Sequence, residues 1–89
     1  MFEWDELKRQ VNLAKHGVDF AAIVGFNWAT AIRKVDMRRD YGEVRRIAYG
    51  LLGTRVHVVI YTDRFGMVRI ISLRKANLQE VDEWVRSRN

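Results

Sequence analysis

The chain has 89 residues, of which 48% are hydrophobic and 30% charged, a balance typical of one small globular domain spanning residues 1–89. It has no cysteine and two histidines, which excludes disulfides and leaves too few ligands for a thiolate or histidine-based metal site. Sixteen Lys and Arg against eleven Asp and Glu give a net charge of +5, which favours a polyanionic partner such as nucleic acid. No apolar run could span a membrane and no signal-peptide pattern is present, so we expect a cytoplasmic protein without a membrane partner.

The N-terminal third of the chain predicts two helices. The first begins after the N-cap Asp5 and ends at Gly17. The apolar side chains that follow helical spacing in it are Trp4, Leu7, Val11 and Ala14. Asp19 can cap a second, short helix that carries Phe20, Ile23 and Val24, and the segment from Gly25 to Trp28 breaks the pattern.

From Ala29 the period of the apolar residues changes to two, which predicts strands at residues 29–36, 44–52, 55–62 and 67–74. A charged loop follows the first strand from Asp36 to Gly42, Gly53-Thr54 makes a hairpin turn, and Asp63 to Gly66 makes a longer one. The segment from Asn77 to Arg86 is a helix that begins with a capping box completed by Glu80. We therefore expect an α+β fold with two N-terminal helices, an antiparallel β-meander sheet and a C-terminal helix.

The two predicted hairpins determine which strand residues share a face of the sheet. The expected core face carries Ile47, Tyr49, Leu51, Val56, Val58, Ile60, Val68 and Ile70. The opposite face carries Arg46, Ala48, Gly50, His57, Val59, Tyr61, Arg69 and Ile71. On that second set Arg46 lies across from Tyr61, with Arg69 close by on the next strand.

Arginines around a tyrosine suit a phosphodiester and a stacked base, because guanidinium groups offer forked donors and aromatic rings stack on bases. A solvated sheet face also commonly carries arginines without any functional reason, and the spacing alone leaves both interpretations open. A register shift of one residue would exchange the two faces and remove this prediction.

The same region carries a resemblance that extends along most of the chain. The N-terminal part is Phe2-Glu3-Trp4-Asp5 with Lys8, Asn12, Lys15-His16-Gly17 and Asp19-Phe20. The middle part is Gly42-Glu43, Arg45 and Tyr49-Gly50. The last part is Val59 to Thr62, Arg64, Arg69-Ile70-Ile71-Ser72, Arg74-Lys75-Ala76 and Glu80. In this order and at these spacings, the chain resembles the BrnT family of bacterial ribonuclease toxins.

The resemblance implies a RelE-like fold and a ribonuclease that inhibits translation. It also implies a BrnA-like antitoxin that neutralises the toxin and carries a DNA-binding segment, so the complex would reach operator DNA through the antitoxin. The chain departs from the family pattern at Leu73, Asn77 and Trp84, where a small residue, Thr and Tyr are usual, and at Gly25 to Ala31, which lacks the usual acidic turn. Trp84 cannot supply a hydroxyl at its position.

The reaction implied by the resemblance needs no metal and no cofactor, since the 2′-hydroxyl of the RNA attacks the neighbouring phosphate. The protein aligns the attack, stabilises the added negative charge and moves two protons. We predict Arg45 and Arg64 as phosphate-stabilising groups, with Arg69 assisting and Glu43 as the candidate base.

Further residues are candidates for holding RNA, and several have an equally simple structural interpretation. These candidates are Arg46, Tyr61, Arg74, Lys75, Lys15 and His16. Arg74-Lys75 could bind RNA or could be a basic strand end near the far end of the sheet. His16 could move a proton, as its unperturbed pKa would allow, or could complement the dipole at a helix C-terminus.

Two other function classes stay open alongside a ribonuclease toxin. One is a non-catalytic module that represses transcription together with a DNA-binding partner, and the other is a general RNA-binding protein. Arg45→Ala distinguishes the ribonuclease toxin from the co-repressor module, because only the toxin hypothesis predicts that the substitution relieves growth arrest.

Overall fold

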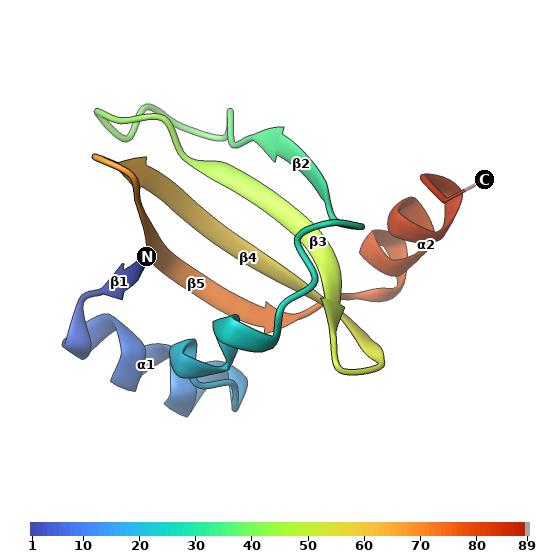
Figure 1. The fold of residues 1–89 in the computed structure, drawn as a ribbon, viewed down its shortest axis with the longest axis horizontal. Helices are drawn as coiled ribbons and strands as arrows, with labels where there is room; N and C mark the ends of the chain where they lie inside the picture. The colour runs from blue at the N-terminus through green and yellow to red at the C-terminus, as the bar shows by residue number, and fades with distance from the viewer. Residues whose placement is uncertain (89) are drawn as a thin grey trace.

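A computed structural model describes residues 1–88 as an α+β fold around one five-stranded sheet (Figure 1). The strands are β1 (Phe2–Trp4), β2 (Ile32–Val35), β3 (Arg46–Leu52), β4 (Arg55–Arg64) and β5 (Met67–Lys75), in the spatial order β1-β5-β4-β3-β2. The helices are α1 (Glu6–His16), the 3₁₀ helix η1 (Phe20–Gly25) and α2 (Leu78–Arg86). None of the helices within residues 1–88 is long and apolar enough to cross a membrane.

The sheet is mixed, so the prediction of a purely antiparallel sheet is wrong. The three-residue strand β1 pairs in parallel with β5, with Phe2 opposite Val68 and Trp4 opposite Ile70. The other neighbouring strands pair antiparallel. A segment this short gives no readable alternation, and its Trp4 also fitted the helical spacing of the residues that follow.

The predicted helix ends are correct, but α1 does not bury its apolar residues. The Asp5 carboxylate accepts hydrogen bonds from the backbone of Leu7 and Lys8 at 2.9 and 3.1 Å. Leu7 and Val11 are 69% and 59% exposed, whereas Asn12 is buried. The Asn12 amide binds the backbone carbonyl of Leu73 at 2.7 Å and the amide N–H of Leu73 at 3.3 Å, so a polar side chain ties α1 to β5. The second predicted helix is the 3₁₀ helix η1, capped by Asp19.

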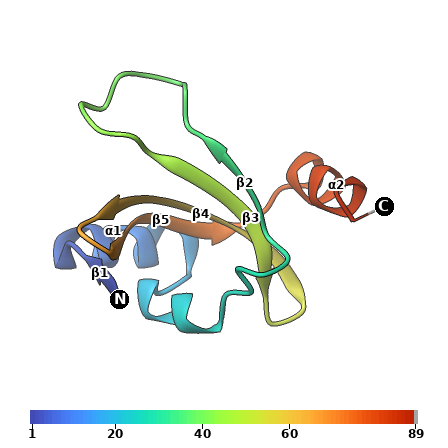
Figure 2. The same ribbon diagram turned by 45° about the horizontal axis from the view of Figure 1, so that its top comes forward.

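The main core lies on the sheet face that carries Ala48, Val59 and Tyr61, here called the first face. The residues between α1 and β2 cover this face (Figure 2). Their buried side chains are Val18, Phe20, Ile23 and Phe26. Gly50 permits the close approach, because a Cβ at this position would lie 2.7 Å from the ring of Phe26 and 3.0 Å from Ala31.

The opposite face, here called the second face, is covered at one end only. Helix α2 packs there through Val81 and Trp84 against Tyr49, Val56 and Val58. The predicted capping box is present: the Asn77 side chain accepts from the Glu80 backbone, and the Glu80 side chain accepts from the Asn77 backbone. The other end of the second face, where β3 begins and β4 ends, is not covered by α2.

These two cores correct the predicted assignment of the faces. The set expected to be open contains Ala48, Val59 and Tyr61, which are buried in the main core. A β-bulge between Ile60 and Tyr61 also shifts the register with β5, so that Val68 and Ile70 lie on the first face and Arg69 on the second. Alternation alone cannot reveal a bulge, because one extra residue exchanges the faces of everything that follows it.

Candidate active site

The uncovered end of the second face holds a cluster of two arginines around one carboxylate. Arg64 donates to Glu43 at 2.8 Å, and the Nε of Arg45 lies 3.8 Å from the second carboxylate oxygen of Glu43. Arg64 ends β4, Arg45 immediately precedes β3, and Glu43 lies three residues before the start of β3. The sheet therefore brings together three of the four residues that the sequence indicated for catalysis.

The segment before β3 is held in place by the sheet and by an aromatic ring. The Thr62 hydroxyl donates to the backbone carbonyl of Val44 at 2.8 Å. The guanidinium carbon of Arg45 lies 4.1 Å from the centroid of the Tyr41 ring, a cation–π geometry. The Nε of Arg45 is buried and has no hydrogen-bond partner within residues 1–88. A buried donor without an acceptor is costly, so this group is suited to an anionic ligand.

Glu43 is negatively charged at neutral pH. The hydrogen bond from Arg64 holds its pKa below the ordinary value, and the charges of Arg64, Arg45 and Lys8 act in the same direction. Ionisation leaves Glu43 able to accept a proton, but a lowered pKa makes it a weak base. The carboxylate is therefore well suited to holding the two guanidinium groups in position.

Arg69, the fourth predicted catalytic residue, lies on the same face but has its own partner. It is opposite Thr62 in the register and donates to Glu3 of β1 at 3.3 Å. The prediction that Arg69 accompanies Arg46 and Tyr61 is wrong, because the β-bulge turns it to the other side of the sheet.

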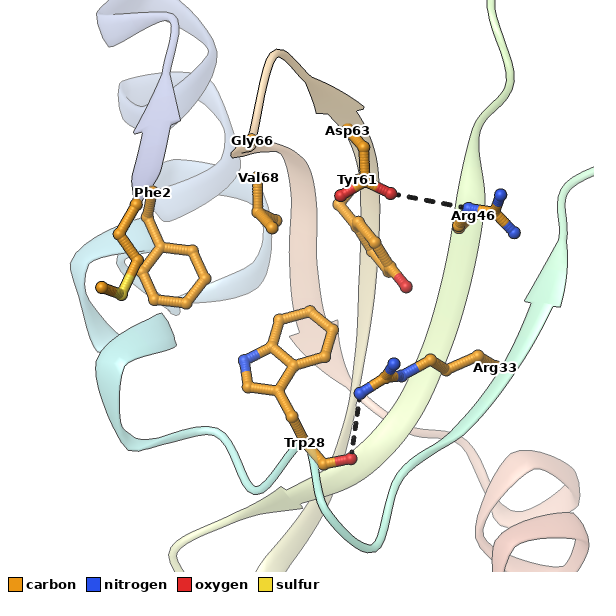
Figure 3. A pocket seen from close by; sticks show the side chains of 9 residues that line it. Phe2, Trp28, Arg33, Arg46, Tyr61, Asp63, Gly66 and Val68 are labelled. Carbon is orange, nitrogen blue, oxygen red and sulfur yellow. Dashed lines mark hydrogen bonds and ion pairs between the residues drawn. The ribbon is translucent and has the colours of Figure 1, made fainter.

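Arg46 and Tyr61 do face each other, but on the first face, in a different cavity (Figure 3). This cavity measures about 490 Å³, and its lining also includes Phe2, Trp28, Arg33 and Asp63. Tyr61 is 4% exposed, and burial raises the pKa of its hydroxyl. The predicted faces did not include these four residues: Phe2 lies in the three-residue strand β1, Trp28 in a loop and Arg33 in β2, while Asp63 ends up in β4, where the sequence predicted a turn.

Of the remaining candidates, Arg74 and Lys75 end β5 at the opposite end of the sheet, and Lys15 and His16 end α1 beside the middle of β5. Arg74 donates to both carboxylate oxygens of Glu80 at 2.8 Å. Lys75 is exposed, lies opposite His57 and is on the first face of the sheet. Lys15 and His16 end α1 and line a groove with Ile71 and Ser72. Burial lowers the pKa of His16, and the charges of Lys15 and Arg74 lower it further, so the imidazole is neutral at neutral pH. Arg74 is therefore first of all an ion-pair partner of α2.

The described residues contain no candidate metal site. Within residues 1–88, no three His, Cys, Asp or Glu side chains lie close enough together to hold a metal ion.

Comparison with known proteins identifies the family of the chain. No curated protein matches the chain significantly. One protein-family model matches residues 4–80, and it describes the ribonuclease toxin BrnT of type II toxin–antitoxin systems. The match spans Glu43, Arg45, Arg64 and Arg69 and covers well over half of the chain. The chain therefore belongs to the BrnT family of ribonuclease toxins.

Proposed function

We propose that the chain is a metal-independent endoribonuclease with a RelE-like reaction, whose active site is the Glu43, Arg45 and Arg64 cluster at the open end of the second face. The observation that carries the proposal is the pair of guanidinium groups held by Glu43, in which the buried Nε of Arg45 has no hydrogen-bond partner within residues 1–88. Family membership supports ribonuclease activity, and the local geometry supports this position for it.

The proposed reaction is an internal displacement at a phosphate of the RNA. The 2′-hydroxyl loses its proton and its oxygen bonds to phosphorus, while the bond from phosphorus to the 5′-oxygen breaks and that oxygen takes up a proton. The products are a 2′,3′-cyclic phosphate and a 5′-hydroxyl. Two proton transfers and one developing charge are all that the side chains have to handle.

Arg45 and Arg64 are placed to stabilise the charge that develops on the phosphate. Glu43 holds both groups close together before the substrate binds. Arg64 is 44% exposed in its side chain and can turn from Glu43 to a phosphate. Arg69 contributes positive charge on the same face, and Glu43 is released as a proton acceptor when Arg64 turns away.

Groups on α1 and β5 are candidates for holding the rest of the RNA strand. Lys15 and His16 line one groove, and the positive charges of Lys15 and Arg74 lower the pKa of His16. His16 is a second candidate base, because its neutral imidazole is the form that accepts a proton. We propose no RNA contact for Lys75, which extends from the other side of the sheet.

Type II systems pair a toxin with a protein antitoxin, so this chain has such a partner. We propose that the partner is BrnA-like, that the complex acts on operator DNA through the antitoxin, that one domain spans residues 1–89, and that the protein works in the cytoplasm, where its RNA target is. The co-repressor without catalysis is the alternative that the following test excludes or supports.

The purified chain is incubated with RNA in EDTA, with and without ribosomes, and the products are analysed for 2′,3′-cyclic phosphate ends. We expect cleavage by the wild type, a large loss in Arg64→Ala, and no loss in Arg55→Ala, an exposed arginine at the other end of β4. Circular dichroism checks that both variants fold. Absence of cleavage under all conditions, with antitoxin binding intact, would favour the co-repressor instead.

A further inference from the structure

The cavity on the first face has the chemistry of a base-binding site. Its walls are aromatic: the Trp28 ring lies edge-on to Tyr61 at 5.1 Å and nearly parallel to Phe2 at 6.3 Å, between ring centroids. The Nε1 of Trp28 is buried and has no hydrogen-bond partner within residues 1–88. The volume of about 490 Å³ is within the range of small-molecule sites.

Charged groups line the same cavity. The guanidinium group of Arg33 lies 5.3 Å from the Trp28 ring centroid and donates to the Trp28 carbonyl at 3.2 Å. Arg46 lies 3.7 Å from Asp63, and Figure 3 shows the Tyr61 hydroxyl directed toward the side where the two arginines lie. The aromatic rings can stack on a base, and the two guanidinium groups can donate to a phosphate. The Asp63 carboxylate can accept from an amino group of the base.

A second pocket shares lining residues with both this cavity and the Glu43, Arg45 and Arg64 cluster, at the same end of the sheet. Its lining includes Glu43 from the cluster and Arg46 and Asp63 from the cavity. A single strand of RNA can therefore cross this edge with a phosphate at the cluster and a neighbouring base in the cavity.

The hairpin tip beside the cavity carries a further aromatic side chain. Phe65 is fully exposed and has a φ of +52°, a conformation that favours glycine or asparagine, and it directly precedes Gly66 in the cavity lining. Neither the exposure nor the left-handed backbone benefits the fold, so the ring is suited to a contact outside the chain.

We infer that the cavity of Trp28, Tyr61, Arg33 and Arg46, extended by Phe65 at the hairpin tip, binds one unpaired base of single-stranded RNA next to the cleavage site. The inference rests on the proposed function for the position of the scissile phosphate, but binding itself can be measured without cleavage.

The test is an NMR titration of the intact chain with a single-stranded RNA hexamer that carries 2′-O-methyl groups and so lacks the attacking hydroxyl. We expect the indole N–H signal of Trp28 to shift and saturate, while that of Trp84, which donates to Thr30, does not move. The same sequence as a duplex should bind more weakly, because its bases are stacked away from the protein.

Variants assign the contacts. Arg33→Gln and Arg46→Gln should each weaken binding about fivefold and reduce the salt slope by about 0.7, as for one lost phosphate contact on a single strand. Phe65→Asn should weaken binding several-fold without lowering stability, which separates recognition from folding. Arg55→Gln is the matched control and should bind like the wild type.

An unchanged Trp28 signal while the hexamer binds elsewhere would overturn the inference. So would a Trp28 signal that responds to the antitoxin protein and not to RNA, which would make the cavity a protein-docking site. If the chain cleaves unmodified RNA but the Trp28 signal does not shift, the base-binding cavity is overturned and the proposed function stands. If the Trp28 signal shifts but the chain does not cleave unmodified RNA, the cavity is supported and the proposed function is overturned.

Discussion

Arg45 and Arg46 are neighbours in the chain, yet the sheet separates them into two chemically different sites. Arg45 belongs to a cluster of charges on the second face, where Glu43 holds two guanidinium groups. Arg46 belongs to an aromatic cavity on the first face, where its only ion-pair partner within residues 1–88 is the exposed Asp63. The comparison shows how two consecutive residues at the start of β3 can reach opposite faces of the sheet, one in each of the two proposed sites.

The largest expected effect separates these two arginines. Arg45→Ala should lower kcat by about 10²–10³-fold, because losing one preorganised donor raises the barrier by about 2.7–4 kcal/mol. Arg46→Ala should raise KM by less than about tenfold and leave kcat nearly unchanged, as for a group that binds substrate and transition state equally. Steady-state kinetics on a short RNA measures both. Equal effects on kcat would show that the two faces do not have separate roles.

Filling the space at Gly50 tests whether the first face is a closed core. We expect Gly50→Ala to reduce the free energy of unfolding by about 1–3 kcal/mol, because the new Cβ would lie 2.7 Å from the Phe26 ring. Gly25→Ala is the control, since its Cβ would meet Leu52 at an ordinary 3.5 Å, and it should change stability by less than about 0.5 kcal/mol. Urea unfolding measures both, and an equal response would contradict the packing described for this face.

The pH dependence of kcat tests which base serves the second face. A base must be deprotonated, so the rate rises with pH through its pKa, about tenfold per pH unit on the acid limb. If His16 is the base, the limb lies below its ordinary pKa of 6.5, because burial and nearby positive charges lower it, and His16→Asn removes it. If Glu43 is the base, the limb lies below 4.5, because Arg64 lowers its pKa, and His16→Asn leaves the profile unchanged. Profiles between about pH 4 and pH 8 distinguish the two.

The smallest expected effect concerns the hairpin tip between the two sites. Phe65→Asn should raise the free energy of unfolding by about 1 kcal/mol, because Phe65 has a φ of +52° that asparagine tolerates better. Val24→Asn removes a similarly exposed side chain, 81% exposed, at a position without a positive φ, and should not stabilise the fold. Thermal unfolding measures both, and an equal change would show that the backbone conformation is not the cause.

Local patterns predicted much of the secondary structure and part of the site. The caps at Asp5 and Asn77 and the β3–β4 hairpin follow from short-range spacing, and so does the placement of Arg46 opposite Tyr61. The chemistry of their side chains and the family resemblance indicate Glu43, Arg45 and Arg64, and the structure brings these three residues together.

Other features were beyond any local pattern. The parallel strand β1 depends on a partner 66 residues away along the chain, since Glu3 pairs with Arg69. The bulge at Ile60/Tyr61 moves Arg69 to the other face without any change in the composition of the strand. Helix α1 has an amphipathic spacing, but its buried residue is Asn12, whose amide donates to the backbone carbonyl of Leu73, while Leu7 and Val11 are exposed.

The sequence by itself determined the fold class, the basic character and the family. These three depend on composition, on the periodicity of the apolar residues and on the order of short motifs, all of which can be read along the chain. Only the tertiary structure decided which face of the sheet is closed and which arginines share a site. Both faces carry apolar residues, so the choice between them depends on where the N-terminal segment and α2 pack. That packing separates Arg45 from Arg46, and with them the proposed chemistry from the proposed recognition of the base.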